Sequence, residues 1–135
     1  MRARAILETC LYVTDLDAAE RFYRDILGLT IVERQAGRHL FFRCGNQMLL
    51  LFNPDSSGVT GGTLPPHGAR GEGHVAFAAT PEEIDAWRTH LAASGIAIES
   101  EIDWSGRGHS IYFRDPAGNS LEFASPGIWG IAEGS

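Results

Sequence analysis

The same pattern of segments occurs twice along the chain. An alternating, strand-like segment that begins at Glu8 leads into a capped helical segment ending at Gly28, a distance of 20 positions. A second segment of this kind begins at His74 and leads into a helical segment ending at Gly95, 21 positions later. The duplication predicts two similar modules, and a side chain able to bind a metal opens the first strand of each.

Each module is expected to contain one amphipathic helix. In the first, Asp17 is a candidate N-cap with Glu20 three residues on, and Gly28 supplies a left-handed stop. In the second, Thr80 and Glu83 have the spacing of a capping box. Apolar residues at helical spacing predict one buried stripe per helix: Ala19, Phe22, Tyr23, Ile26 and Leu27 in the first, and Ile84, Trp87 and Leu91 in the second.

Three probable strands follow each helix, so the prediction is an α+β fold of two βαβββ modules in a single domain, residues 1–135. Aligning the repeated Phe-Arg and proline positions makes Leu50 the counterpart of Glu122. The strands are expected at 29–34, 38–44 and 47–53, and at 96–102, 109–115 and 120–125. Module one covers 5–54, a glycine-rich linker 55–72, module two 73–126 and a tail 127–135.

Strand alternation sorts the side chains of each sheet into two faces. One face is bulky and apolar, as a surface under helices should be, with Leu11 in the first strand and Phe77 in the fifth as examples. The other face carries small residues together with Glu8, His74 and Glu122. These three groups converge in one cavity if the two sheets curl together.

Composition excludes several function classes. The net charge of −6 and the scattered arginines argue against a nucleic-acid partner. No apolar run approaches the roughly 20 residues of a membrane span, so we expect a cytoplasmic protein with no membrane association. Cys10 and Cys44 lie far apart and are interpreted as free thiols, with Cys10 expected to be buried.

Three segments carry a resemblance to a known family: LYVTDLDAAERFYRDILGL at 11–29, GHVAF at 73–77 and SIYFRDPAGNSLEF at 110–123. The chain resembles the vicinal oxygen chelate superfamily, which includes glyoxalases, bleomycin-resistance proteins and extradiol dioxygenases. The resemblance covers almost the whole chain. It implies that the two modules form a cupped, barrel-like mixed sheet around a divalent metal, with the helices on its outer face.

The resemblance also implies the metal ligands, which here are Glu8, His74 and Glu122. The family usually has His or Gln at the position of Glu8, and glyoxalase I has a ligand Glu where this chain has Leu50. Two carboxylates and one imidazole suit Zn, Mn, Ni, Co or Mg, and they weaken the case for dioxygenase chemistry, which uses two His and one carboxylate.

Such a site would act on a small-molecule substrate through two adjacent oxygens, as a glyoxalase-like isomerase or lyase. Glu122 or Glu8 would serve as the catalytic base. Arg43, Arg107 and Arg114 are candidates for holding an anionic group. The remaining candidate substrate-binding residues share the inward face of the strands: Cys10, Tyr12, His39, Phe41, Ser110, Tyr112 and Arg114.

A second reading stays open: a metal-free protein that binds a small molecule or an antibiotic, as bleomycin-resistance proteins do. Dioxygenase or thiol transferase chemistry is a further alternative. His67, in a Pro-Pro-His-Gly loop, is interpreted as a solvated residue or a residue of the cavity rim, and not as a metal ligand. The resemblance also favours a homodimer, in which the site lies either within one chain or across two.

Overall fold

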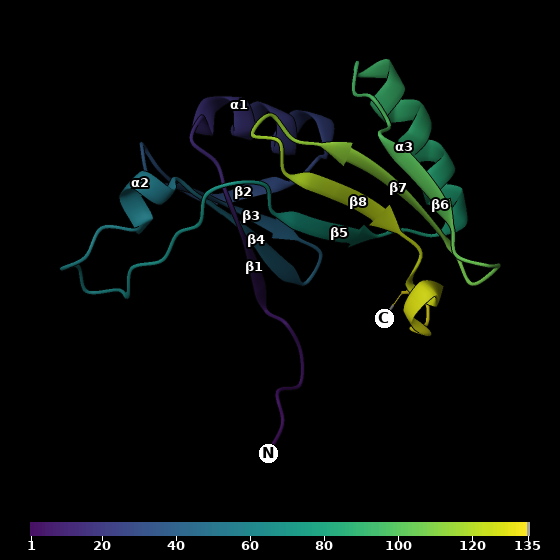
Figure 1. Ribbon diagram of the computed structural model, residues 1–135, viewed down its shortest axis with the longest axis horizontal. Coiled ribbons are helices and arrows are strands. Elements are labelled where there is room, and N and C mark those ends of the chain that lie inside the picture. The colour runs from purple at the N-terminus through teal and green to yellow at the C-terminus, as the bar shows by residue number, and fades with distance from the viewer. Residues whose placement is uncertain (135) are drawn as a thin grey trace. The chain divides into compact units, whose positions relative to one another are not determined.

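The structure, a computed structural model, describes residues 1–134 and divides into two compact units, Met1–Gly73 and His74–Ser135 (Figure 1). The first unit contains β1 (Glu8–Tyr12), α1 (Leu16–Arg21), the π-helical turn η1 (Phe22–Ile26), β2 (Thr30–Gln35), β3 (His39–Cys44), β4 (Gln47–Phe52) and the short helix α2 (Pro54–Ser57). The second contains β5 (His74–Ala78), α3 (Pro81–Ala93), β6 (Ser100–Asp103), β7 (His109–Arg114), β8 (Ser120–Ala124) and the 3-10 turn η2 (Pro126–Trp129). The α+β fold of two βαβββ modules is confirmed.

Each module forms one four-stranded mixed sheet, and the two sheets have the same strand order. The orders are β1-β4-β3-β2 and β5-β8-β7-β6, with the first strand of each module parallel to the last. Cys10 pairs with Leu50 just as Ala76 pairs with Glu122, so the predicted equivalence of Leu50 and Glu122 is confirmed. The hydrogen-bonded ladders of the described residues make two separate sheets and do not close into a barrel.

The first helix begins two residues earlier than predicted and is not uniform. Its N-cap is Asp15, whose carboxylate accepts a hydrogen bond from the Ala18 amide at 3.0 Å, so the prediction of Asp17 as the cap was wrong. The last turn is π-helical, and it directs two consecutive aromatic side chains, Phe22 and Tyr23, into the core. Gly28 ends this segment with φ at +72°, as expected.

The second helix follows the prediction closely. The Thr80 hydroxyl accepts from the Glu83 amide, and the Glu83 carboxylate accepts from the Thr80 amide, which completes the capping box. Strand β6 is shorter at its start than the predicted segment 96–102, because pairing with β7 begins only at Glu99, whose amide donates to the Tyr112 carbonyl.

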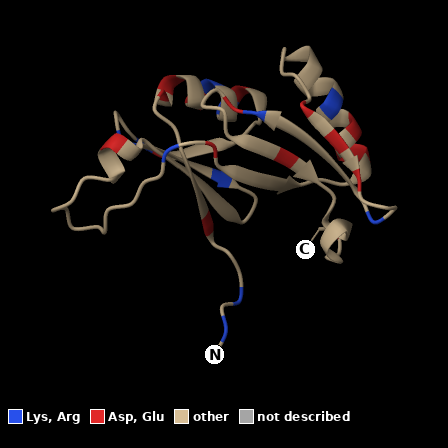
Figure 2. Cartoon of the chain, viewed as in Figure 1, with Lys and Arg blue, Asp and Glu red and all other residues tan. Residues whose placement is uncertain are grey.

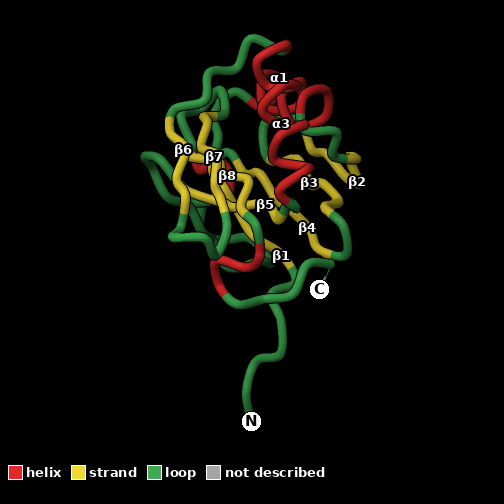
Figure 3. Tube along the Cα trace, turned by 90° about the vertical axis from the view of Figure 1, so that its right-hand side faces the viewer, coloured by secondary structure: helices red, strands yellow, loops and turns green. Residues whose placement is uncertain are grey.

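Each of the two longer helices contacts the sheet of its own module, α1 through β3 and α3 through β7. Figure 3 shows both helices in red and the strands in yellow. In module two, Trp87 of α3 stacks on Phe123 of β8 with ring centroids 4.3 Å apart, which confirms Trp87 as part of the helix core. In module one, Tyr23 contacts Phe42 of β3. We call the other side of each sheet, on which Glu8 and Glu122 lie, the helix-free face.

Charged residues are mostly carried by the helices and loops, and the strands are largely uncharged (Figure 2). Acidic residues nevertheless lie in four of the strands: Glu8, Glu33, Glu101, Asp103 and Glu122. Within residues 1–134, no helix is both long enough and apolar enough to cross a bilayer.

Candidate functional site

Glu122 is the buried acid of module two. It lies in the middle of β8 on the helix-free face, directly opposite Tyr112 of β7, and its side chain is 8% exposed. A buried carboxylate is costly unless it is paired or hydrogen-bonded. The pKa of Tyr112 is raised first by its own burial, then by the charge of Glu122 and by a hydrogen bond to this carboxylate.

His74 completes this group from the neighbouring strand β5. Its Nδ1 lies 2.9 Å from the carbonyl oxygen of Ser120, and because a carbonyl can only accept, Nδ1 carries the hydrogen. In a neutral ring the lone pair is then on Nε2, and this nitrogen lies 3.2 Å from Oε1 of Glu122. A lone pair and a carboxylate oxygen attract each other at this distance only when a proton or a metal cation lies between them.

The structure thus brings together two of the three predicted metal ligands, His74 and Glu122. Among the described residues, no group of three or more His, Cys, Asp and Glu side chains is gathered that could hold a metal. Glu8 is exposed at the start of β1 in the other module, and its assignment as a ligand stays a prediction.

In module one, three predicted substrate-binding residues share an aromatic cluster on the helix-free face. Tyr12, on β1, donates or accepts a hydrogen bond at 2.7 Å with Nδ1 of His67. His67 meets Phe52 of β4 edge-on, with ring centroids 4.5 Å apart. Phe52 in turn contacts His39 and Phe41 of β3. The loop that carries His67 therefore folds back onto the strands of its own module.

His39 differs from His74 in two ways: its ring is buried, and its Nδ1 faces a guanidinium instead of a backbone carbonyl. Arg38 can only donate, so Nδ1 of His39 accepts from it at 2.6 Å, and Nε2 donates to Glu33 at 2.9 Å. The ring is buried and stacks on Phe41 with centroids 4.0 Å apart. His39 therefore presents an aromatic edge, and no free nitrogen, to a ligand.

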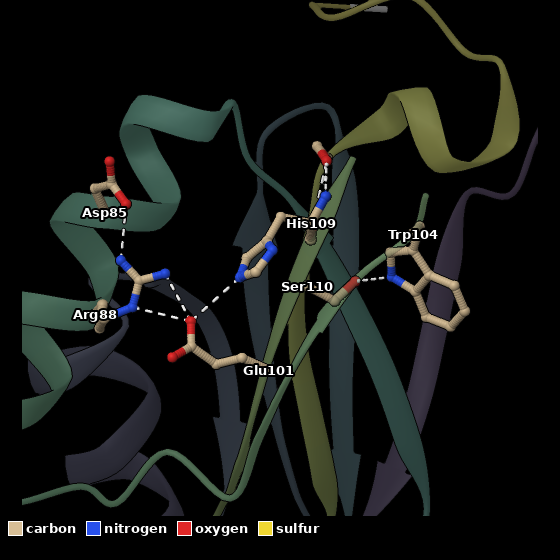
Figure 4. A network of polar contacts seen from close by, with 7 residues as sticks. Asp85, Arg88, Glu101, Trp104, His109 and Ser110 are labelled. Atoms are coloured by element: carbon tan, nitrogen blue, oxygen red, sulfur yellow. Dashed lines mark hydrogen bonds and ion pairs between the residues drawn. The ribbon is translucent and has the colours of Figure 1, made fainter. Parts of the chain in front are cut away.

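The remaining predicted residues of module two are already engaged by protein groups. The Ser110 hydroxyl is buried and accepts from Nε1 of Trp104 at 2.9 Å (Figure 4). Arg114 donates to Glu99 at 3.0 Å and to the Gly118 carbonyl at 2.9 Å. Both residues support the sheet, and their substrate-binding role stays a prediction.

Cys10 and Cys44 are free thiols, as predicted. Cys10 is exposed, so the expectation that it is buried was wrong: its strand position on the helix-free face directs it away from the helix core. The pKa of the Cys10 thiol is raised, first by partial burial and then by the negative charge of Glu8. A raised pKa disfavours the thiolate, so the thiol is not activated as a nucleophile.

Two groups of the site were not found from the sequence. The Ser120 carbonyl, which orients His74, is a backbone group and leaves no signature in residue type. Trp104 follows β6 in a Trp-Ser-Gly-Arg-Gly turn, which signals a hairpin but does not indicate that the indole reaches Ser110.

Comparisons with known proteins agree with this architecture. The sequence model of the Glyoxalase/Bleomycin resistance protein/Dioxygenase superfamily matches residues 5–123. A lactoylglutathione lyase from Agrobacterium tumefaciens is 46% identical, with 97% of this chain and 100% of that chain covered and a TM-score of 0.94. A glyoxalase/dioxygenase from Nostoc punctiforme is 26% identical, with 90% of each chain covered and a TM-score of 0.67.

A virulence protein from Salmonella typhimurium is 25% identical, with 93% of this chain and 98% of that chain covered and a TM-score of 0.72. No curated protein is matched by the chain. The family match covers most of the sequence and includes all eight strands of the two modules, up to Phe123 in β8. The chain belongs to the glyoxalase, bleomycin-resistance protein and dioxygenase superfamily, and its fold is of glyoxalase type.

Proposed function

We propose that the protein is a metal-dependent enzyme of glyoxalase type, a lyase or isomerase that acts on a small molecule through two adjacent substrate oxygens. One observation carries the proposal: the Ser120 carbonyl accepts the Nδ1 hydrogen of His74, so that Nε2 is directed at the buried Glu122, 3.2 Å from its Oε1. Histidines that bind metals typically donate their other ring nitrogen to a carbonyl or carboxylate in this way.

The donor atoms also have a suitable separation. Two ligand atoms that each lie about 2.1 Å from one ion, at tetrahedral or octahedral angles, are roughly 3.0–3.4 Å apart. The Nε2 to Oε1 distance of 3.2 Å lies in this range. We assign His74 and Glu122 as ligands and keep Glu8 as the proposed third. This donor set accepts Zn, Mn, Ni, Co or Mg.

When bound, the ion supplies polarisation of a substrate carbonyl and charge stabilisation. The protein residues do the rest. Glu122 accepts a proton from the substrate carbon that adjoins the carbonyl, because its carboxylate is buried next to the binding position. Tyr112 donates its hydrogen bond to Glu122 and so holds the carboxylate in place while the proton moves.

Metal analysis of the purified protein tests the proposal. We expect about one equivalent of a divalent ion per chain, lost in His74→Ala and in Glu122→Ala. His39→Ala is the matched control and should leave the metal content unchanged, since His39 contacts Arg38 and Glu33 in module one and neither His74 nor Glu122. The first reaction to assay is the formation or cleavage of lactoylglutathione, the compound in the name of the relative from Agrobacterium tumefaciens.

A metal-free binding protein is the second candidate, and the aromatic cluster of Tyr12, Phe41, Phe52 and His67 favours it, because such a surface suits a flat ligand. The binding protein becomes the better proposal if the native protein takes up no divalent ion and if His74→Ala has the same metal content as the native protein. A homodimer stays part of the proposal and is tested by the sedimentation mass of the purified chain.

A further inference from the structure

Module two contains a pocket that the proposed chemistry does not use. It has a volume of about 470 Å³, within the approximate 300–1,000 Å³ range of small-molecule sites. Two segments form it: the turn after β6 and the η2 region that follows β8. The lining residues are Trp104, Arg107, Gly127, Ile128, Trp129 and Gly130.

The two segments are held together at backbone distance. A Cβ atom on Gly127 would lie 2.6 Å from the Arg107 carbonyl oxygen, and one on Gly108 would lie 2.7 Å from Cγ2 of Ile128. Only glycine allows so close an approach. The Ser125 hydroxyl also accepts from the His109 amide at 2.8 Å. The pocket is therefore built into the fold and does not depend on a loop that folds over a ligand.

Its aromatic wall is oriented in advance. The Nε1–H group of Trp104 donates to the buried Ser110 hydroxyl and so fixes the indole (Figure 4). The residue as a whole remains 36% exposed. Trp129, in η2, is 80% exposed. Two exposed indoles beside one pocket offer flat apolar surface at low conformational cost.

The pocket also contains a cation available for a ligand. Module two has three arginines within the described residues, and two of them are engaged: Arg88 with Asp85 and Glu101, and Arg114 with Glu99. No ion pair or hydrogen bond of the Arg107 side chain is found among residues 1–134. A guanidinium beside apolar walls is complementary to a carboxylate attached to a flat apolar group.

We propose that the pocket bounded by Trp104, Arg107, Ile128 and Trp129 binds a small aromatic carboxylate, with the ring between the indoles and the carboxylate on Arg107. This site goes beyond the proposed metal chemistry, because none of its residues belongs to the His74 and Glu122 pair.

Calorimetric titration of the full chain with 2-naphthoate tests the proposal, and 2-naphthalenemethanol serves as the uncharged analogue. We expect saturable binding of naphthoate at one site, and at least tenfold weaker binding of the alcohol. Arg107→Gln should raise the Kd by roughly tenfold, the effect of one charge-assisted hydrogen bond. Trp129→Ala should weaken binding by a similar factor, whereas Arg21→Gln, at an exposed arginine of α1 in module one, should leave the Kd unchanged.

The titration is repeated on chelator-treated protein and on Glu122→Gln, where naphthoate binding should persist, so that failure of the metal site and failure of the pocket are separate results. All variants are checked for an unchanged melting temperature. An unchanged Kd in Arg107→Gln would overturn the proposal. A second result would overturn it as well: naphthoate does not bind, and Trp129→Ala dissociates an oligomer. The Trp129 indole would then belong to a contact between chains.

Discussion

The helix-free faces of the two sheets have the same backbone and opposite chemistry. At the central pair, module one has Cys10 beside Leu50, and module two has Ala76 beside the buried Glu122. At the end of the strands, module one has Tyr12 beside Phe52, and module two has two alanines, Ala78 and Ala124. Module one thus offers aromatic surface, while module two combines an acid and an imidazole with small side chains that leave space.

The histidines show the same contrast. His39 is buried and its Nε2 faces the exposed Glu33, whereas His74 is half-exposed and its Nε2 faces the buried Glu122. Equivalent strands of one fold can therefore carry different side chains, because the hydrogen-bonded ladder fixes positions and not side-chain chemistry.

The most severe test converts module two into module one at its central pair, with Glu122→Leu. We expect the bound metal to fall to background and kcat/KM to fall by about a thousandfold, the range for loss of a general base. The melting temperature should stay level or rise, because a buried charge is replaced by an apolar group. Metal analysis, kinetics and thermal melting check this. Retained metal would show that Glu122 is no ligand.

The two histidines should respond in opposite ways to alanine. His74→Ala should remove the metal with little loss of stability, since the side chain is 51% exposed. His39→Ala should keep the metal and lower the free energy of unfolding by about 2 kcal/mol, because it leaves Glu33 and Arg38 without their buried partner. Denaturant unfolding and metal content measured on both variants decide the matter. Equal changes in metal content and in the free energy of unfolding of the two variants would show that the two histidines do not differ in this way.

Tyr112 and Phe41 occupy equivalent positions in β7 and β3, opposite Glu122 and Leu50. Tyr112→Phe removes the hydrogen bond to Glu122, and we expect kcat to fall by roughly tenfold with KM nearly unchanged. Phe41→Leu, at the position where no acid faces the ring, is the matched control and should leave kcat as it is. A change confined to KM would assign Tyr112 to substrate contact instead of to positioning the acid.

The smallest effect concerns the ion pairs that join each helix to its edge strand. Module one pairs Glu20 of α1 with Arg34 of β2, and module two pairs Arg88 of α3 with Glu101 of β6 (Figure 4). The hydrogen bond from Arg88 is the main cause that lowers the pKa of Glu101 below its ordinary 4.5, followed by that from His109.

A lowered folded pKa means that the unfolded state binds the proton more readily. The stabilisation by Glu101 is therefore present above about pH 4.5 and is lost as the pH falls below that value. Glu101→Gln should cost less than about 1 kcal/mol, because the pair is exposed. We measure the free energy of unfolding between pH 3 and 7. As the pH falls, this free energy should decrease less steeply in Glu101→Gln than in the control Glu82→Gln.

Much of this architecture is determined by the sequence itself. The repeated alternation predicted the eight strands and their faces, the capping residues at Thr80 and Glu83 predicted the start of α3, and a three-residue alignment predicted that Leu50 replaces an acid. These features are local, or follow from the two-residue period of a strand, so short stretches of sequence contain them.

The tertiary structure alone decided the chemistry of individual side chains. His39 and His74 are the same residue type at strand positions, yet one nitrogen of His74 is presented to Glu122 because the Ser120 carbonyl from another strand holds the other. Trp104 reaches Ser110 across a hairpin, and Gly108 lets the C-terminal turn close the pocket beside it. These contacts depend on backbone groups and on close approaches between segments. The type of a single residue in the sequence does not reveal them.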